Sequence, residues 1–297
     1  MLEELKTFIA VVEIKNFTKA AEYLSLSQPS VSVHIKNLEN YFGEKLIDRS
    51  VRQKSIKITE QGYLLYKRAK EVVSIIEAAK LEVKIDTEYI VGDIKISAVP
   101  SAANYILPKY IAEFSKKYPN INIELSMKSF DDVKKDLVNL DADIGIIDRK
   151  IMSDNFEQQE CFKENMKLIF PYDYKTYISN IHSYENLSGQ NWILREKGSG
   201  TRFLTEYFLN KKQIIPKSVF IMGSSYSIKE AVKNGMGISI LSGSACEQFE
   251  NSNEIFCMDI DNEFSRTFYS ISQKNFKPKR SVSLFLDEIQ NSDAQIY

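Results

Sequence analysis

Apolar residues recur at helical spacing near the start of the chain and predict three short helices. Residues 2–12, 17–24 and 31–42 each carry one apolar stripe. Ser27 is suited to cap the third helix, and Pro29 is tolerated in a first turn, where backbone amides lack intrahelical partners. The last two segments therefore predict a helix-turn-helix. The residues that its second helix would bury are Val31, Ile35, Leu38 and Phe42.

The outer face of this second helix opens with short polar side chains. Such side chains, on a helix that is packed from behind, can reach base edges in a DNA major groove. Gln28 is the leading candidate for a direct base contact, and Pro29 is expected to be structural. His34 has two interpretations, a base contact or an ordinary surface histidine. The candidate DNA-contacting residues of the helix are Gln28, Pro29, Ser30, Ser32, Val33, His34 and Lys36.

Two short strand-like segments follow, at 45–47 and 55–58, and the loop that joins them is locally basic. A hairpin beside a helix-turn-helix forms a wing, and its cations would contact DNA phosphates. The alternative is a solvated charged hairpin. The candidate phosphate contacts in the loop are Arg49, Arg52 and Lys54.

Residues 59 to about 84 predict one long helix capped by Thr59. Its apolar positions alternate spacings of four and three, which is typical of a helix that pairs with another helix. A helix lying on its own domain is the alternative, but the stripe is narrow and has charged flanks, which favours dimerisation. The predicted dimer seam consists of Leu65, Ala69, Val72, Ile76, Ala79 and Val83.

From Gly92 onward, strand and helix patterns alternate, which indicates a parallel sheet covered by helices. Two such α/β blocks occur in series and predict two lobes with a cleft between them. In open α/β sheets, ligands bind beyond the carboxyl ends of the strands. Pro100-Ser101 and Ser224-Ser225 each follow a predicted strand, so both pairs are expected to face the cleft.

A glycine-rich run, residues 198–202, follows another apolar strand and opens a helix. Glycines let backbone amides approach a ligand, and a helix N-terminus attracts anions. Considered alone, a glycine-rich turn before a helix is more often purely structural, and it is the place of this run in the second lobe that raises the ligand interpretation. Together with the two strand ends, the candidate effector-binding residues are Pro100, Ser101, Gly198, Ser199, Gly200, Thr201, Arg202, Ser224 and Ser225.

Composition narrows the class of protein. The 297 residues carry a formal net charge of −1, so DNA affinity must come from local charge. The acidic amphipathic start and the lack of a bilayer-length apolar run favour a cytoplasmic protein without a membrane partner. Cys161, Cys246 and Cys257 are odd in number and far apart, which suits buried thiols better than disulfides. No metal-ligand spacing is present, so we expect no metal site.

These features together resemble a LysR-type transcriptional regulator. The specific part of the resemblance is LKTFIAVVEIKNFTKAAEYLSLSQPSVSVHIKNLENYFGEKLIDRS, followed by ITEQG. It implies an α/β protein with an all-α winged helix-turn-helix at 1–58 and a dimerising linker helix at 59–88. It further implies a two-lobed, periplasmic-binding-protein-like effector domain, with subdomain I at 89–162 and 267–297 and subdomain II at 163–266.

Two details refine the resemblance. Val33 stands where the family usually has a basic or polar residue, and it could meet a thymine methyl group. The Gly-Ser-Gly-Thr-Arg run resembles one branch of the family that senses small metabolites. Val99, Ala102 and Ala103 are apolar, which leaves room for an effector with a carbon skeleton and an oxyanion.

The sequence thus predicts a DNA-binding regulator controlled by a small anionic metabolite, acting as a homodimer or homotetramer, with RNA polymerase a candidate partner. The alternative is an enzyme or solute-binding α/β domain fused to a DNA-binding module. We expect no cofactor and no catalytic residues, because the chain offers no nucleophile elbow, dinucleotide fingerprint or metal cluster. Asp143 and Asp148 flank a predicted strand and could be paired acids, but fold and solubility explain them as well.

Overall fold

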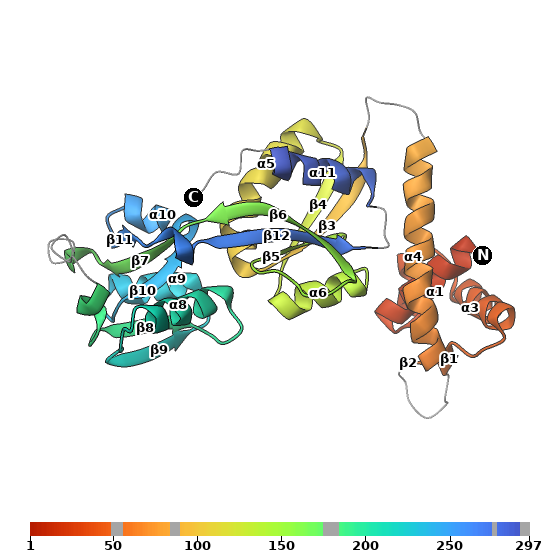
Figure 1. The fold of residues 1–297 in the computed structure, drawn as a ribbon. Coiled ribbons are helices and arrows are strands. Elements are labelled where there is room, and N and C mark those ends of the chain that lie inside the picture. Colours follow the sequence, from red (N-terminus) through yellow and green to blue (C-terminus); the bar gives the residue numbers. More distant parts are fainter. Residues whose placement is uncertain (49–55, 84–89, 175–183, 275–277, 292–297) are drawn as a thin grey trace. The chain divides into compact units, whose positions relative to one another are not determined.

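The computed structural model describes the chain in five stretches, which are residues 1–48, 56–83, 90–174, 184–274 and 278–291. The chain divides into two compact units, Met1–Thr87 and Glu88–Tyr297, and each is described by itself. Figure 1 shows the first unit in red and orange and the second in yellow to blue. No helix in the described stretches is long and apolar enough to cross a membrane.

The first unit is a three-helix core with a short hairpin and a long helix. Phe8, Val31, Ile35 and Leu38 are almost fully buried at its centre. The hairpin strands are antiparallel, with Ile47 opposite Ile58. The elements are α1 (Leu2–Ile14), α2 (Phe17–Tyr23), α3 (Gln28–Phe42), β1 (Ile47–Asp48), β2 (Lys57–Ile58) and α4 (Glu60–Val83).

The predicted cap of α3 is confirmed, because the Ser27 hydroxyl accepts a hydrogen bond from the Ser30 amide at 3.2 Å. The prediction that this helix buries Phe42 is wrong. Phe42 is 46% exposed, since the buried face of α3 ends at Leu38, and its ring instead meets the edge of Tyr41 at 5.1 Å.

The first half of α4 packs against its own unit, which corrects the predicted dimer seam. Ala69 is 1% exposed within the core of the unit, and Leu65 is partly buried against the same core. Ala69 therefore belongs to the core of the unit itself, and Leu65 packs against the same core with part of its side chain still accessible. Val72 is exposed, Ile76 is half-buried and Ala79 is exposed, whereas the side chain of Val83 lies outside the described residues.

The second unit contains a five-stranded sheet of order β4-β3-β5-β12-β6. β3 runs parallel to β4 and β5, whereas β12 is antiparallel to β5 and β6. Its core includes Ile94, Ile144, Phe114 and Phe285, from two strands and two covering helices. The elements are β3 (Gly92–Ala98), η1 (Ala102–Ile106), α5 (Leu107–Lys117), β4 (Ile121–Met127), α6 (Phe130–Val138), β5 (Ile144–Ile147), β6 (Phe156–Glu164), β12 (Arg266–Gln273) and α11 (Arg280–Asn291).

A second group of strands forms the other half of this unit. β7 lies between β10 and β11 and is antiparallel to both, and β8 and β9 form a parallel pair. A parallel bridge from Trp192 to Ile238 joins the three-stranded set to the two-stranded pair. The elements are β7 (Met166–Pro171), η2 (Tyr172–Tyr174), η3 (Tyr184–Leu187), β8 (Asn191–Arg195), α8 (Gly200–Lys211), β9 (Ser218–Met222), α9 (Ser225–Lys233), β10 (Ser239–Ser242), α10 (Gly243–Asn251), β11 (Ile255–Asp259) and η4 (Asn262–Phe264).

Alternate residues of β7 face opposite sides, so the sheet is covered on both faces. Leu168 and Phe170 join the core beneath α8, and Ile169 joins the core beneath α9 and α10. This arrangement explains why residues 168–170 of β7 are all apolar.

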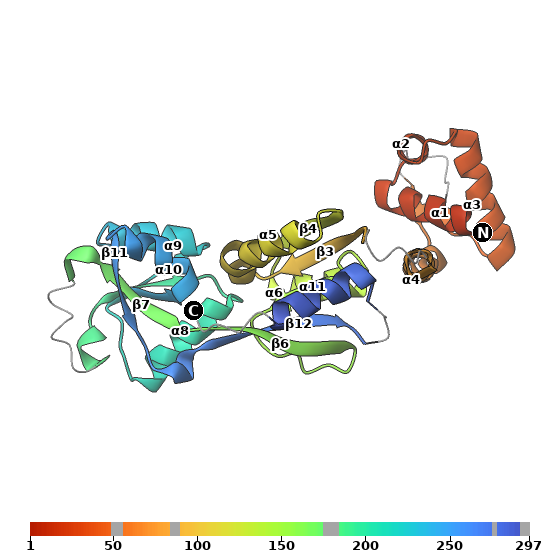
Figure 2. The same ribbon diagram turned by 90° about the horizontal axis from the view of Figure 1, so that it is seen from above.

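The expected parallel sheets are in fact mixed. β6, which the sequence pattern did not predict, pairs with β12 along its whole length, and only Asn165 separates β6 from β7. Figure 2 shows β6 and β12 side by side where the chain passes between the two halves of the unit. β6 escaped prediction because most of its residues are polar and exposed.

Candidate functional site

A cavity of about 480 Å³ lies in the second unit, where several strands end. Its walls are the segments that follow β3, β4, β5 and β8, together with Arg266 at the start of β12. β3, β4 and β5 are parallel, so their carboxyl ends meet at one edge of the sheet. This is where open α/β sheets place ligands.

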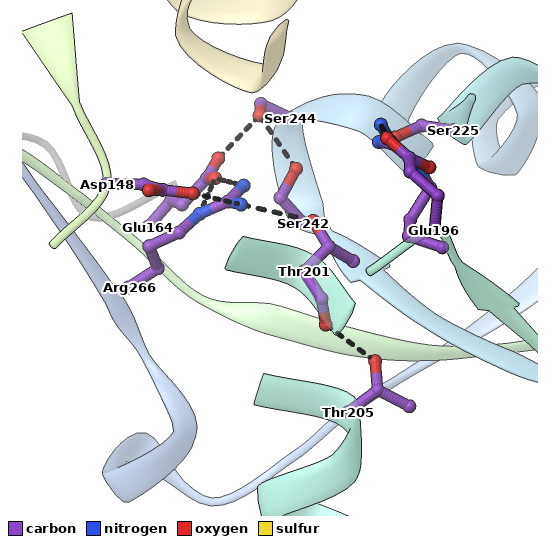
Figure 3. Close-up of polar contacts among 10 residues, drawn as sticks. Asp148, Glu164, Glu196, Thr201, Thr205, Ser225, Ser242, Ser244 and Arg266 are labelled. Atoms are coloured by element: carbon purple, nitrogen blue, oxygen red, sulfur yellow. Dashed lines mark hydrogen bonds and ion pairs between the residues drawn. The ribbon is translucent and has the colours of Figure 1, made fainter. Parts of the chain in front are cut away.

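A buried ion pair joins the two strands that pass between the halves. Arg266 and Glu164 face each other across β12 and β6, and their side chains are 2% and 1% exposed. The Arg266 guanidinium donates from Nε to Glu164 Oε1 at 3.0 Å and also from Nη2, while Ser244 donates to Oε2 at 2.6 Å. Figure 3 shows this network, in which Arg266 also donates to Thr201 at 3.1 Å.

Asp148, the first residue after β5, brings a carboxylate to the same place. Its side chain is 5% exposed, and Oδ2 lies 3.9 Å from Nη1 of Arg266. A methyl group on Gly200 would lie only 1.8 Å from that oxygen. Gly200 is therefore required for the close approach of the carboxylate to the first residue of α8, where the helix dipole favours negative charge.

The turn before α8 has a second glycine with a different role. Gly198 has φ +91°, a conformation that side chains other than glycine rarely adopt. Ser199 occupies the N-cap position, but its hydroxyl makes no capping hydrogen bond. The hydroxyl of Thr201 accepts from Arg266, so its own hydrogen remains available to a ligand.

Arg195 and Glu196 line the cavity and are paired with each other. The Arg195 guanidinium makes two hydrogen bonds to Glu196, at 2.8 and 2.7 Å, and a third to Ser225 at 3.1 Å. Burial alone would raise the pKa of Glu196, but the hydrogen bonds from Arg195 hold this pKa below its usual value. Each of the three guanidinium nitrogens of Arg195 thus donates one hydrogen bond to a protein group.

Three further cations line the cavity. The Arg149 guanidinium stacks over the Phe130 ring, 4.0 Å from its centroid. Lys128 and Lys197 are exposed, and neither forms an ion pair with any residue that the structure describes. These two amines are the cations best placed to meet an anionic ligand.

The first unit presents a different candidate surface on α3. Gln28, Pro29, Val33 and Lys36 are exposed there, and Val33 is 54% exposed. Gln28 donates to the hydroxyl of Ser32 at 3.1 Å, one turn further along. Ser32, Val33 and Lys36 also line a hollow of about 520 Å³ between α3 and the start of the hairpin.

His34 faces the interior of the unit rather than this surface. Its Nδ1 lies 2.8 Å from the Thr7 hydroxyl, which donates to the Glu3 carbonyl at 2.7 Å. Because that hydroxyl has a single hydrogen, Nδ1 is the donor to Thr7. The structure therefore separates His34 from the exposed residues with which it was grouped.

Glu39 fixes the hairpin to α3. Its Oε1 accepts hydrogen bonds from the amides of Leu46 and Ile47, at 3.0 and 3.2 Å. The predicted phosphate contacts of the wing, Arg49, Arg52 and Lys54, lie outside the described residues.

Two family models together match almost the whole chain. The model "Bacterial regulatory helix-turn-helix protein, lysR family" matches residues 2–63, and "LysR substrate binding domain" matches residues 88–294. The chain belongs to the LysR family of transcriptional regulators. It is a DNA-binding regulator with an effector-binding domain, and the family consists of regulators, not enzymes.

Three known proteins illustrate what this chain is similar to. The transcriptional regulator CysL of Bacillus subtilis is 40% identical over 258 residues, which are 87% of this chain and 86% of CysL. Full-length OxyR from Pseudomonas aeruginosa superposes with a TM-score of 0.77 at 20% identity, covering 99% and 96% of the two chains. The regulatory domain of CcmR from Synechocystis, in complex with 2-PG, has a TM-score of 0.61 at 24% identity and covers 67% of this chain and 96% of its own.

In this LysR-family chain, six of the nine predicted effector residues line one cavity. They are Pro100, Ser101, Gly198, Ser199, Gly200 and Thr201. The other three do not reach it. Arg202 is held by Glu206 and the Arg195 carbonyl, Ser224 caps α9, and Ser225 accepts from Arg195.

The sequence prediction missed several side chains of the same cavity. Asp148 directly follows a short apolar strand, which was a usable signal, because strand ends were expected to face the cleft. No local sequence pattern marked Arg266 or Glu164 as a residue of the cavity or its surroundings. Asp143, the suggested acid partner of Asp148, lies at the opposite end of β5, where it accepts from the Lys95 amide at 2.8 Å.

No group of three or more metal-ligating side chains gathers within the described stretches. The three cysteines are free and buried, as the sequence predicted. The cavity offers groups that can recognise a ligand. It combines backbone amides and hydroxyls at the start of α8, two unpaired amines and a buried carboxylate.

Proposed function

We propose that this LysR-family regulator binds a small metabolite with an anionic group in the cavity at the start of α8, and that this binding controls how α3 contacts DNA. The cavity carries the proposal, because Lys128, Lys197 and the hydroxyls of Ser101 and Ser199 line it without a partner among the described residues. The complex of CcmR with 2-PG supports a small-molecule effector for this fold.

The exposed face of α3 supports a direct reading of DNA. Gln28 and Ser32 can exchange hydrogen bonds with base edges, Val33 can contact a thymine methyl group, and Lys36 can contact a phosphate. Pro29 and Ser30 shape the first turn of the helix. His34 supports the reading face indirectly, through its hydrogen bond to Thr7 on α1.

Gln28→Ala should relax sequence choice, whereas Lys36→Ala should weaken binding to every sequence. Loss of a good base contact reduces discrimination by about 1–3 kcal/mol, and loss of one phosphate contact reduces the salt slope by about one. Fluorescence anisotropy on the promoter and on random duplex, at several salt concentrations, measures both effects. Lys116→Ala, which changes an exposed lysine of α5, is the matched control. Equal discrimination between promoter and random duplex by wild type and Gln28→Ala would contradict the proposal that Gln28 contacts a base.

Anion binding in the cavity should depend on its two unpaired amines. A ligand at a hundredfold excess over its Kd raises the free energy of unfolding by about 2.7 kcal/mol. We expect Lys128→Ala/Lys197→Ala to weaken such a ligand on the order of tenfold. Denaturation with a panel of small carboxylates, phosphates, sulfate and 2-PG measures the effect, with Lys116→Ala as the control. Stabilisation that every cavity variant retains would place the effector elsewhere.

LysR regulators act as oligomers, and we propose that α4 supplies the dimer contact in this chain. Exposed apolar residues run along one side of this helix, spaced by eight and three positions; they are Leu64, Val72 and Ile75. Effector binding would change the spacing of the two DNA-binding units, with a coupling of typically ~1–3 kcal/mol. Three further points stay predictions. They are the oligomeric state, homodimer or homotetramer, a contact with RNA polymerase, and the domain boundaries 1–58, 59–88, 89–162, 163–266 and 267–297.

A further inference from the structure

One oxygen of the effector cavity has no partner. Asp148 lines the cavity with a side chain that is 5% exposed, and its Oδ1 is buried without any hydrogen bond within the described part of the chain. Buried polar atoms are almost always hydrogen-bonded, and a charged one that is not has a large desolvation cost. The unpaired oxygen therefore points to a donor that arrives with the ligand.

The neighbouring cation does not fill this role. Arg266 approaches only the other carboxylate oxygen, at 3.9 Å, and directs its hydrogen bonds to Glu164 and Thr201. Ser225 and Glu196 occupy Arg195 in the same way. Lys128 and Lys197 are exposed, whereas the carboxylate is buried.

Asp148 also changes what the start of α8 can accept. Its carboxylate is seated against Gly200, the first residue of the helix, where a Cβ atom would come within 1.8 Å of Oδ2. The negative charge that the helix dipole favours at this end is thus already supplied by the protein. A bare oxyanion placed beside Asp148 would meet a like charge in a partly dehydrated site.

We infer that the effector is a small zwitterion, with an ammonium group for Asp148 Oδ1 and a carboxylate or other oxyanion for Lys128 and Lys197. This inference rests on the proposed function of the cavity and specifies the class of ligand. The buried carboxylate selects the ammonium group, the exposed amines select the anion, and Ser101, Ser199 and Thr201 offer hydroxyls. The class includes the small amino acids and their close derivatives.

Matched pairs of probes test the ammonium group directly. Aspartate and succinate, glutamate and glutarate, and cysteine and 3-mercaptopropionate differ by that group, and sulfate and phosphate serve as bare oxyanions. Calorimetric titration of the full-length protein should show at least one ammonium-bearing member binding tenfold or more tightly than its partner. A panel in which no ammonium-bearing member binds better than its partner overturns the inference.

Asp148→Asn removes the charge and keeps the shape. It should weaken the ammonium-bearing probe by about 10- to 100-fold, the range of a charged hydrogen bond. The same variant should bind sulfate or phosphate more tightly than wild type, a gain that misfolding cannot produce. Asp131→Asn is the matched control, because Asp131 lines the same cavity with a side chain that is 72% exposed, and it should change affinity less than threefold.

The two proposals fail in different ways. If Asp148→Asn weakens both members of a pair equally and leaves sulfate unchanged, the zwitterion inference is wrong, although the cavity can still be the effector site. If probes bind but neither Asp148→Asn nor Lys128→Ala/Lys197→Ala changes their affinity, the proposed effector site is itself wrong.

Discussion

Glu164→Ala should lower the free energy of unfolding of the second unit by about 3–5 kcal/mol, because it leaves Arg266 as a buried charge without its main partner. Arg266 and Glu164 are 2% and 1% exposed, and Glu164 accepts from Arg266 and from Ser244. Asp148 at 3.9 Å compensates only part of the loss, since it approaches a different nitrogen of the guanidinium.

The single tryptophan makes the measurement specific. Trp192 is fully buried in the second unit, so its fluorescence during urea denaturation reports the unfolding of that unit. Glu160→Ala, on the same strand with a side chain 67% exposed, should stay within about 0.5 kcal/mol of wild type. Glu164→Leu/Arg266→Met should recover most of the stability, because replacing both partners removes the unpaired charge. A loss below about 1 kcal/mol in Glu164→Ala would contradict the assigned role.

The ion pair between Glu164 and Arg266 could not be predicted from the sequence. Glu164 and Arg266 are 102 positions apart, and they meet only because β6 and β12 pair antiparallel in one register. Neither residue stands in a local pattern that sets it apart from other charged residues. Long-range pairing of this kind is decided by the topology of the sheet, which the alternation of strands and helices did not reveal.

The helix-turn-helix was predicted closely because its determinants are local. A 3.6-residue apolar period, the cap at Ser27 and the proline at Pro29 all act within one or two turns. The linker helix was predicted in extent but not in orientation. The same apolar period suits a partner helix or the helix's own core, and the structure assigns Leu65 and Ala69 to the core.

The cavity at the start of α8 was predicted in part. The glycine run after β8 was located correctly, since strand, turn and helix follow each other in the sequence. The reason for Gly200 was not predictable, because its neighbour Asp148 follows β5 and lies more than fifty positions away in the sequence. A local motif therefore gave the position of the cavity, while the fold brought the Asp148 carboxylate to it.

Gly62→Ala should destabilise the DNA-binding unit by about 1–3 kcal/mol, although alanine is the better helix former by about 1 kcal/mol. A Cβ atom at this position would lie 2.2 Å from the Leu46 carbonyl oxygen and 2.8 Å from Cγ2 of Ile58. That carbonyl oxygen accepts from the amide of Thr59 at 3.1 Å, so it cannot retreat without breaking this bond at the junction between the hairpin and α4. The Thr59 hydroxyl holds the same junction, since it lies 2.7 Å from the Lys45 carbonyl oxygen and 3.1 Å from that of Leu46. The steric cost falls on the backbone and therefore exceeds the gain in helix propensity.

Two spectroscopic probes distinguish the unfolding of the first unit from that of the second. The first unit is largely helical and contains no tryptophan, so Gly62→Ala should shift the helical circular-dichroism transition and leave the Trp192 fluorescence transition in place. Gln61→Ala, at the exposed neighbouring position, should change neither by more than about 0.5 kcal/mol. Promoter affinity should fall with Gly62→Ala, because α3 and the hairpin depend on the same core. If Gly62→Ala left the stability of the first unit unchanged or raised it, α4 could move away from Leu46 at little cost. The close approach of Gly62 to Leu46 would then not hold the hairpin in place.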